Sequence, residues 1–235
     1  MKKGILLLVV SMLVFSVAAM AITIDTITGV WQNPKGENNT ASDILISSNA
    51  PDYTYSKVKW GETGIPGGST SSYEWISTPT SFDVNTGDKF LLGDFIHNNL
   101  TIPTSSNALV SVELSFTIGT FDVPFSTLST IFEFTHDETT NTGANNCCND
   151  LVTIINGPFN QAITIGSVEY YFSLLGFSTD GGNTIQTFFS TEEGTDNLAG
   201  LYATITANPI PEPASLVLFG TGLGVLGLAA WRRKK

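Results

Sequence analysis

Positive charge is scarce in this chain. Ten of its 235 residues are Lys or Arg, against 21 Asp or Glu. Six of the ten basic residues occupy the first three and last four positions, so the stretch from Asp25 to Glu212 holds four lysines and all 21 acids, a net charge of −17. A surface this acidic repels nucleic acid and anionic lipid and attracts cations. Nucleic acid is therefore excluded as a partner.

Catalytic signatures are missing too. The sequence has no Gly-x-Ser-x-Gly nucleophile elbow, no HExxH zinc motif and no Gly-rich phosphate loop. Its two histidines, His97 and His136, have carboxylates nearby and so fit a zinc or acid–base site. We favour a structural role for them instead, with hydrogen bonds to loop backbone. The nearby acids are Asp94, Asp137 and Glu138. We predict that the protein is not an enzyme.

Only two cysteines occur, Cys147 and Cys148, and they are adjacent. Neighbouring Cα atoms lie about 3.8 Å apart across a trans peptide, below the usual range for a disulfide. Three states remain open: a strained vicinal disulfide, free thiols, and a bridge to another chain. A catalytic thiol is not expected, because acidic surroundings raise the pKa of a thiol.

The N-terminus has the build of a secretory signal peptide. Lys2 and Lys3 form a charged region, residues 4–17 are an apolar run, and Ala19-Met20-Ala21 is a small-x-small cleavage site. We expect signal peptidase to remove residues 1–21, so that the mature chain begins at Ile22.

The C-terminus carries a second apolar segment. Residues 214–231 contain no charge, and eighteen helical residues cover roughly 27 Å, close to the hydrocarbon core of a bilayer. We predict a transmembrane helix over 214–231. The basic residues that follow it should stay cytoplasmic and leave the body of the protein outside. They are Arg232, Arg233, Lys234 and Lys235.

Pro211, Glu212 and Pro213 stand directly before that apolar segment. With the basic cluster behind it, the segment from 209 to 235 resembles a PEP-CTERM sorting signal. The resemblance implies that an exosortase cuts at this motif, in Gram-negative bacteria that make exopolysaccharide. It also implies an exported protein that is transiently anchored in the inner membrane and then passed to the cell surface or extracellular matrix.

The body, residues 22–208, has the size of a single domain. Apolar and polar residues alternate along it, and no window shows helical periodicity over three turns. In residues 108–118 one predicted face carries Val110, Val112, Leu114, Phe116 and Ile118. Residues 92–99 are also apolar at alternate positions and end in Asn-Asn, as a strand that runs into a turn would. Further strands are expected within 129–136, 150–155, 162–177 (two strands turned near Gly166), 184–191 and 201–207.

Gly, Asn and Asp clusters separate these strands, among them the predicted turn at residues 192–197. Many short strands with regular turns indicate an all-β antiparallel sandwich, jelly-roll-like in type. We expect helix only in the N-terminal signal segment and the C-terminal transmembrane segment.

Four segments of the body carry a second resemblance: GVWQNP, VKWGE, FLLGDFIHNN and FEFTHDETTNTG. The body resembles the THxN family of PEP-CTERM proteins and is similar to the choice-of-anchor K domain over residues 29–207. The family motif falls on His97 and Asn99, with Ile96 in place of its Thr. A second motif falls on His136, Asp137, Glu138 and Asn141. The resemblance implies an exported β domain and no particular reaction.

Calcium is the better metal candidate, although no cofactor is expected to be required. Residues 136–150 are rich in Asp, Glu and Asn, and calcium takes six to eight oxygen ligands on flexible loops. The predicted ligands are Asp137, Glu138 and Asp150. The segment lacks the spacing of known calcium loops, and ordinary solvated turns have the same composition.

Aromatic residues gather in the first third of the chain. Exposed on a sandwich they would stack on sugar rings, but aromatics also fill sandwich cores, and we expect most of them to be core. We predict a structural or adhesive surface protein associated with exopolysaccharide; the alternative is a secreted carbohydrate-active or metal-dependent enzyme. The aromatics are Trp31, Tyr53, Tyr55, Trp60, Tyr73 and Trp75.

Overall fold

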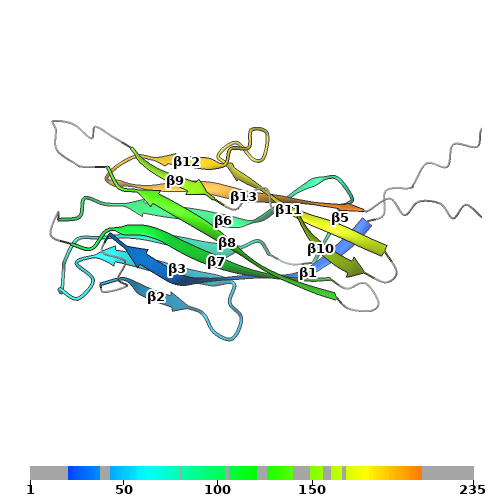
Figure 1. Ribbon diagram of the computed structural model, residues 1–235, viewed down its shortest axis with the longest axis horizontal. Helices are drawn as coiled ribbons and strands as arrows, with labels where there is room; N and C mark the ends of the chain where they lie inside the picture. The colour runs from blue at the N-terminus through cyan, green and yellow to red at the C-terminus, as the bar shows by residue number, and fades with distance from the viewer. Residues whose placement is uncertain are drawn as a thin grey trace, which may run out of the picture.

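The structure is a computed structural model and shows two antiparallel sheets packed face to face (Figure 1). It describes residues 21–37, 43–79, 81–103, 106–120, 126–139, 149–155, 160–165 and 168–207. No residue in these ranges is helical. The predicted all-β antiparallel sandwich is therefore confirmed for this part of the chain.

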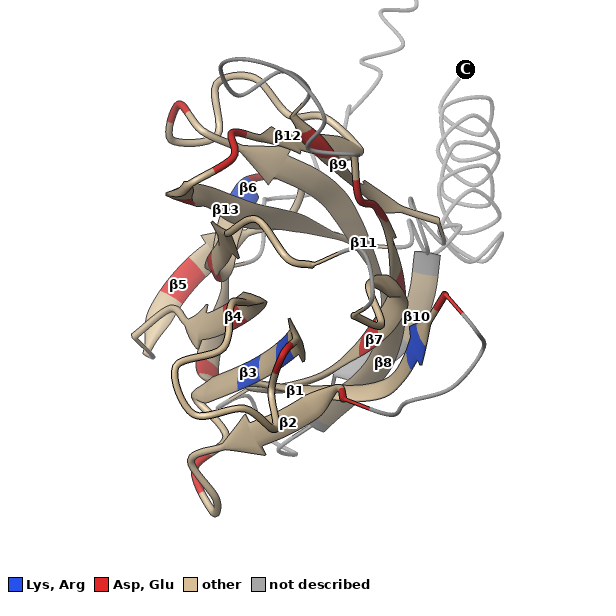
Figure 2. Cartoon of the chain, turned by 90° about the vertical axis from the view of Figure 1, so that its left-hand side faces the viewer, with Lys and Arg blue, Asp and Glu red and all other residues tan. Residues whose placement is uncertain are grey.

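The six-stranded sheet has the spatial order β12 (Phe188–Thr191), β9 (Asp150–Ile154), β8 (Ser126–Asp137), β7 (Leu109–Thr120), β1 (Ala21–Gly36) and β5 (Phe82–Asn85). The seven-stranded sheet has the order β10 (Asn160–Ile165), β11 (Val168–Ser178), β13 (Thr195–Ala207), β6 (Lys89–Asn99), β4 (Thr70–Ser77), β3 (Tyr55–Gly61) and β2 (Leu45–Ser48). Two meanders, β2-β3-β4 and β7-β8-β9, build much of the two sheets, while β4 to β7 alternate between them. Seen along the strands, the sheets curl toward each other (Figure 2).

The chain enters and leaves the sandwich at one end. The start of β1 pairs with β5, Ala21 opposite Asn85, and β13 ends close by, because the Gly87 amide donates to the Ile205 carbonyl at 2.8 Å. At the other end β6 finishes at Asn99 opposite Thr195, where β13 begins. Figure 1 shows the first of these ends on the right. We call it the terminal end, and the opposite end the loop end.

Alternation of side chains places one face of each sheet in the core. In β7 the predicted inward set holds from Val112 to Ile118. It is wrong at the first two positions, where Leu109 is buried and Val110 is 41% exposed. The cause is a register shift between β1 and β7, where Lys35 faces Ser111 but Gly36 faces Leu109. A bulge of this kind turns the residues beyond it to the opposite face.

Aromatic rings hold the two sheets together. Trp31 on β1 contacts Tyr73 and Phe95 of the other sheet at 5.8 and 5.9 Å between ring centroids, and Trp75 meets Phe116 edge-on at 4.8 Å. The expectation that the early aromatics are mostly core is confirmed. The buried ones are Trp31, Trp60, Tyr73 and Trp75.

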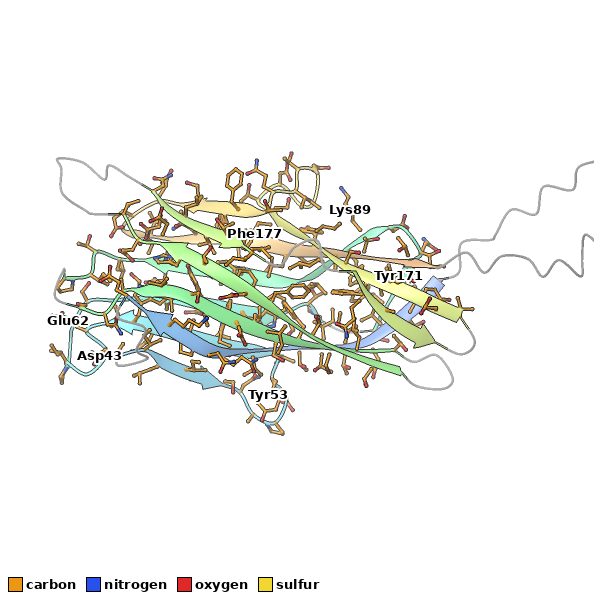
Figure 3. All side chains as sticks on the ribbon, viewed as in Figure 1. Asp43, Tyr53, Glu62, Lys89, Tyr171 and Phe177 are labelled. Carbon is orange, nitrogen blue, oxygen red and sulfur yellow. The ribbon has the colours of Figure 1, made fainter. Side chains whose placement is uncertain are left out.

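Tyr53 is the exception among these aromatics. It is 39% exposed and lies in the loop before β3 (Figure 3). Its neighbour Tyr55 is half-buried at the start of that strand.

Strand boundaries follow the sequence closely in the second half of the body. The predicted hairpin in 162–177 forms as β10 and β11, and β8 and β9 lie where expected. Two boundaries were wrong. β12 begins at Phe188 rather than near residue 184, and residues 195–197, predicted as turn, are the first three residues of β13.

Acidic positions outnumber basic ones over both sheets (Figure 2). Lys35 lies 3.5 Å from Glu133, Lys57 lies 2.6 Å from Glu74, and the Lys89 ammonium donates to the Gly182 carbonyl at 2.5 Å. These contacts are half-exposed, and exposed ion pairs contribute at most about 1 kcal/mol.

Among the described residues, no helix is long and apolar enough to cross a membrane. Ala21 is described, as the exposed first residue of β1. Several predicted features lie outside the described residues: the signal segment with Ala19, the sorting motif of Pro211, Glu212 and Pro213, the 214–231 helix, the basic cluster Arg232 to Lys235, Asn141, Cys147 and Cys148.

Candidate functional site

The first motif places two polar side chains inside the sandwich. On β6 the buried positions are every second residue from Phe95, so His97 and Asn99 point inward while Ile96 and Asn98 point outward. His97 and Asn99 are both fully buried. A His-x-Asn spacing on a strand therefore delivers both side chains to the same face.

The second motif lies on the six-stranded sheet and also points side chains into the interior of the sandwich. His136 is the last inward residue of β8, and its side chain is fully buried. Asp150 opens β9, which pairs with β8 so that His136 lies opposite Val152. Asp150 is therefore the diagonal neighbour of His136 on the same face. Its side chain is also fully buried.

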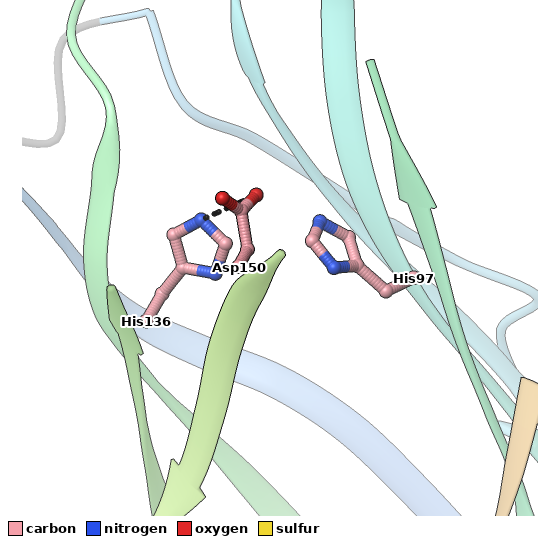
Figure 4. Close-up of side chains that lie close together, drawn as sticks. All are labelled: His97, His136 and Asp150. Carbon is pink, nitrogen blue, oxygen red and sulfur yellow. Dashed lines mark ion pairs between the residues drawn. The ribbon is translucent and has the colours of Figure 1, made fainter. Parts of the chain in front are cut away.

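His97, His136 and Asp150 converge between the two sheets at the loop end (Figure 4). One ligand atom from each of the three lies within 4.8 Å of the others. The His136 Nε2 atom is 3.8 Å from Asp150 Oδ2, and the two imidazole rings stand edge to face at 5.2 Å between centroids. Two further acids extend the group, since Glu138, Asp150 and Glu193 also place one carboxylate oxygen each within 4.8 Å of one another.

A hydroxyl favours one nitrogen of His97 as the carrier of the proton. The Thr191 hydroxyl donates to the Asp150 carbonyl at 3.4 Å and lies 2.8 Å from His97 Nδ1. With its proton directed at the carbonyl, this hydroxyl can accept from Nδ1–H, which favours the tautomer of His97 that carries its proton on Nδ1. Nε2 of His97 is thus left as a bare acceptor, and it has no hydrogen-bond partner among the described residues. Burial and the nearby His136 hold the pKa of His97 well below its usual range.

His136 is held at both ring nitrogens. Its Nδ1 meets the hydroxyl of Tyr73, and its Nε2 lies 3.0 Å from Glu138 Oε2. Burial, followed by the charges of Asp150 and Glu138, raises the pKa of Tyr73 well above its ordinary value, so the hydroxyl keeps its proton. Tyr73 can therefore donate to Nδ1 while Nε2–H donates to Glu138.

The carboxylate of Asp150 is satisfied on one oxygen only. Oδ1 accepts from the Thr139 amide at 2.9 Å and from the Thr139 hydroxyl at 3.0 Å. Among the described residues, Oδ2 has no hydrogen-bond partner, and neither has the buried Oε1 of Glu138. Burial raises the pKa of Asp150, Glu138 adds to this effect, and Thr139 and His136 oppose it.

Aromatic rings pack against one side of the cluster. Trp60 of β3 lies 5.1 Å from the His136 ring and 5.6 Å from the His97 ring, and Tyr73 lies 4.8 Å from His97. These rings keep water from one side of the cluster and lower its local dielectric. Charges held there interact more strongly than they would at the surface.

Lysines do not neutralise the acids of this cluster. Lys35, Lys57 and Lys89 are engaged elsewhere, and Lys59 lies on the outer face of β3 between two inward residues. Within the described part of the chain, up to three carboxylates therefore face two imidazoles without a fixed positive charge.

The structure separates the predicted site residues into two groups. It brings His97, His136, Glu138 and Asp150 together. Asp137 is exposed, because it follows the inward His136 on the same strand, and Asp94 faces outward on β6. The sequence prediction missed Tyr73 on β4, Thr191 at the end of β12 and Glu193 just after that strand.

Three cavities on the described surface lie away from the cluster. The first, of about 320 Å³, lies between β5 and the start of β6. The second, of about 190 Å³, lies beside Phe177 and Phe189, and the third, of about 180 Å³, is lined by Leu91 and Tyr202. His97, His136 and Asp150 line none of these three cavities.

Residues 209–234 match the PEP-CTERM protein-sorting motif. No curated protein matches the chain, so the resemblance of the body to the THxN family rests on its sequence motifs alone. The match covers the predicted signal with Pro211, Glu212 and Pro213, and its last residue is Lys234 of the basic cluster. A PEP-CTERM motif marks a protein that is exported, passes through the membrane to the cell surface and is processed by exosortase, and this chain is such an exosortase target.

Proposed function

We propose that the mature sandwich serves at the cell surface or in the extracellular matrix as a structural or adhesive protein associated with exopolysaccharide, and that it catalyses no reaction. The sorting motif at 209–234 carries the proposal, because it follows almost directly on the last strand of the domain. The sorting signal therefore directs this domain to the cell surface.

The outer face of the six-stranded sheet suits such a role. Across β1, β7 and β8, Thr28 lies opposite Thr117, which lies opposite Ser129, and the hydroxyls of the last two are 3.1 Å apart. Beyond an intervening row of Val30, Ser115 and the exposed Ile131 lies the row of Gln32, Glu113 and Glu133, in which the Gln32 amide donates to Glu113 at 3.0 Å. The hydroxyls, amides and carboxylates of these rows fit an extended hydrated polymer.

Sugar stacking on a strip of tryptophans is not the mode of contact here. Trp31, Trp60 and Trp75 have at most 1% of their surface exposed. Contact with polysaccharide must use the polar face and exposed rings such as Tyr53.

The alternative function is a secreted carbohydrate-active or metal-dependent enzyme. The grouping of His97, His136 and Asp150 with two further acids favours it, because general acids and bases act in such groups. Against it, the side chains of all three are fully buried, and a substrate must touch its catalytic groups.

Co-sedimentation of the protein with purified matrix polysaccharide tests the proposal. One variant removes the hydroxyls of the outer row, and the matched control does the same on β13 of the other sheet. We expect the first to lose at least tenfold in bound fraction and the second to bind as the wild type does. The variant is Thr28→Val, Thr117→Val and Ser129→Val; the control is Thr204→Val and Thr206→Val.

Two outcomes contradict the proposal. If the wild type does not sediment with the polymer, the adhesive role is wrong. If the protein shortens the polymer and releases new reducing ends, the enzyme alternative is correct instead.

A further inference from the structure

The cluster at the loop end has an unusual balance of donors and acceptors. His97 Nε2, Asp150 Oδ2 and Glu138 Oε1 are buried acceptors without a hydrogen-bond partner among the described residues. A buried polar atom left unpaired costs about 1–3 kcal/mol. His97 and Glu138 lie on either side of Asp150, each in a group of three that includes it, so these acceptors call for a positively charged group beside Asp150.

We propose that this cluster binds one divalent transition-metal ion, with zinc the best fit, and that the ion joins the two sheets. The ligands are His97, His136, Asp150 and Glu138.

The chemistry of the donors selects the class of metal. Two imidazoles with two carboxylates are a set that zinc and its neighbours prefer, whereas calcium and magnesium take oxygen ligands. Calcium was expected on Asp137, Glu138 and Asp150, but Asp137 is exposed and the other two acids lie beside histidines. A soft cation therefore fits these residues better than a hard one.

The geometry is close to what zinc requires. Bonds of about 2.0–2.1 Å in a tetrahedron place ligand atoms roughly 3.4 Å apart. The ligand atoms of His97, His136 and Asp150 lie within 4.8 Å of one another, so these three need to close by at most roughly 1.4 Å. Glu138 lies outside this group of three, although its Oε2 is 3.0 Å from His136 Nε2, and its side chain must turn farther to reach the ion. Rotation of buried side chains about χ1 and χ2 supplies this movement without moving a strand.

Hydrogen bonds at the Nδ1 atoms of both histidines can orient the rings so that each Nε2 faces a metal ion. Metal-bound histidine usually donates its other N–H to an oxygen, which orients the ring. Thr191 plays this part for His97, since it accepts from Nδ1–H. The Tyr73 hydroxyl can donate or accept. It can therefore accept from Nδ1–H of His136 when Nε2 turns from Glu138 to the metal.

Placement between sheets gives the ion a structural role. His97 belongs to β6 of the seven-stranded sheet, while His136 and Asp150 belong to β8 and β9 of the other. One ion would therefore link three strands at the end where the long loops meet. Since the site is buried and four protein ligands can close it, it resembles structural rather than catalytic zinc sites.

The test measures metal binding by the full-length protein, with Zn²⁺ and Co²⁺ themselves as probes. After chelation and reloading we expect one zinc per chain, and cobalt should give the intense visible bands of a tetrahedral site without a sulfur charge-transfer band. Zinc at 100 times its Kd should raise Tm by about 5–10 °C. Calcium at the same concentration should not.

Variants assign the ligands. His97→Gln or Asp150→Asn should weaken zinc binding by at least about 100-fold, because removing a ligand costs more than removing its outer partner. Asp137→Asn is the matched control, one residue from a ligand but on the outer face, and should stay within about twofold of the wild type. A Cys147→Ser, Cys148→Ser double variant should bind zinc as the wild type does.

A positioning variant covers the case in which a ligand variant does not fold. Thr191→Val keeps the volume but removes the acceptor for Nδ1–H, and should weaken binding by about 10–100-fold. The unpaired N–H should lower the Tm of the metal-free protein by no more than about 10 °C, so the variant should still fold. Thr191→Ser should restore binding. The proposal is wrong if the wild type binds no zinc or cobalt, if His97→Gln and Asp150→Asn bind normally, or if the cysteine variant abolishes binding.

Discussion

Substituting Gly29 by alanine should destabilise the protein through one ring, the indole of Trp75. A Cβ on Gly29 would lie 2.6 Å from Cδ1 and 2.9 Å from Cε2 of that indole, and nearer still to Nε1. Ordinary contacts to a Cβ lie at 3.4–4 Å. The ring or strand β1 must therefore shift by roughly 1 Å, in a core that resists such shifts.

The indole cannot give way on its far side. Its benzene ring lies against Gly93 of β6, where a Cβ would be 2.5 Å from Cη2, and its Nε1–H donates to Ser77 Oγ at 3.0 Å. Overpacking a core typically costs 1–3 kcal/mol. Alanine is favoured over glycine in a strand by about 0.5–1 kcal/mol. The net expectation for Gly29→Ala is a loss of about 1–2 kcal/mol in the free energy of unfolding.

A double-mutant cycle in urea separates this cause from others. Trp75→Leu alone should cost about 3 kcal/mol or more. In that background Gly29→Ala should be neutral or stabilising, which gives a coupling energy of about 2 kcal/mol. Gly64→Ala is the control, because a Cβ there meets nothing within 4 Å, and it should change stability by less than about 0.5 kcal/mol. Additive effects of Gly29→Ala and Trp75→Leu would refute the reasoning.

Three further outcomes are expected. N-terminal sequencing of the exported protein should begin at Ile22, and an intact Met1 would contradict cleavage. Replacing Pro211–Pro213 by alanines should leave full-length protein in the membrane of a host that has the sorting enzyme, whereas mass spectrometry should find the wild type shortened at its C-terminus. Hydrogen bonds from the Thr184 amide, then from the Ser178 hydroxyl, lower the pKa of Asp180 to about 2. Its contribution to stability should be complete above the usual value of 3.8 and lost as pH falls toward 2. An NMR titration midpoint near 3.8 would show that these bonds do not form.

Local alternation was enough to predict the class of fold, since β8 to β11 lie where period-2 patterns placed them. It failed where one strand slips against another. Leu109 and Val110 exchange faces at a bulge that depends on β1, seventy residues earlier. The start of β13 was taken for a turn because its Thr, Asp and Asn residues are turn formers, yet pairing with β6 makes it a strand. In both cases the conformation depends on pairing with a strand that is distant in the sequence.

The candidate site shows the same limit. Sequence neighbours of the histidines, Asp94 and Asp137, were the first acids considered, but odd spacings on a strand point to opposite faces. Asp150 lies fourteen residues after His136 and meets it through strand pairing. One signal was present, because Asp150 shares the apolar face of its strand with Val152 and Ile154. An acid on a buried face needs a partner.

The two ends of the sandwich give the protein an orientation with respect to the cell. The sorting segment follows β13 at the terminal end, so a chain held in the membrane by that segment would stand on it by this end. His97 pairs with Asn197, ten residues before Ala207, which is roughly 33 Å back along β13 at about 3.3 Å per residue. The histidine cluster would then lie at the end of the domain away from the membrane, and a link made at a cut C-terminus would leave that end facing the surroundings of the cell.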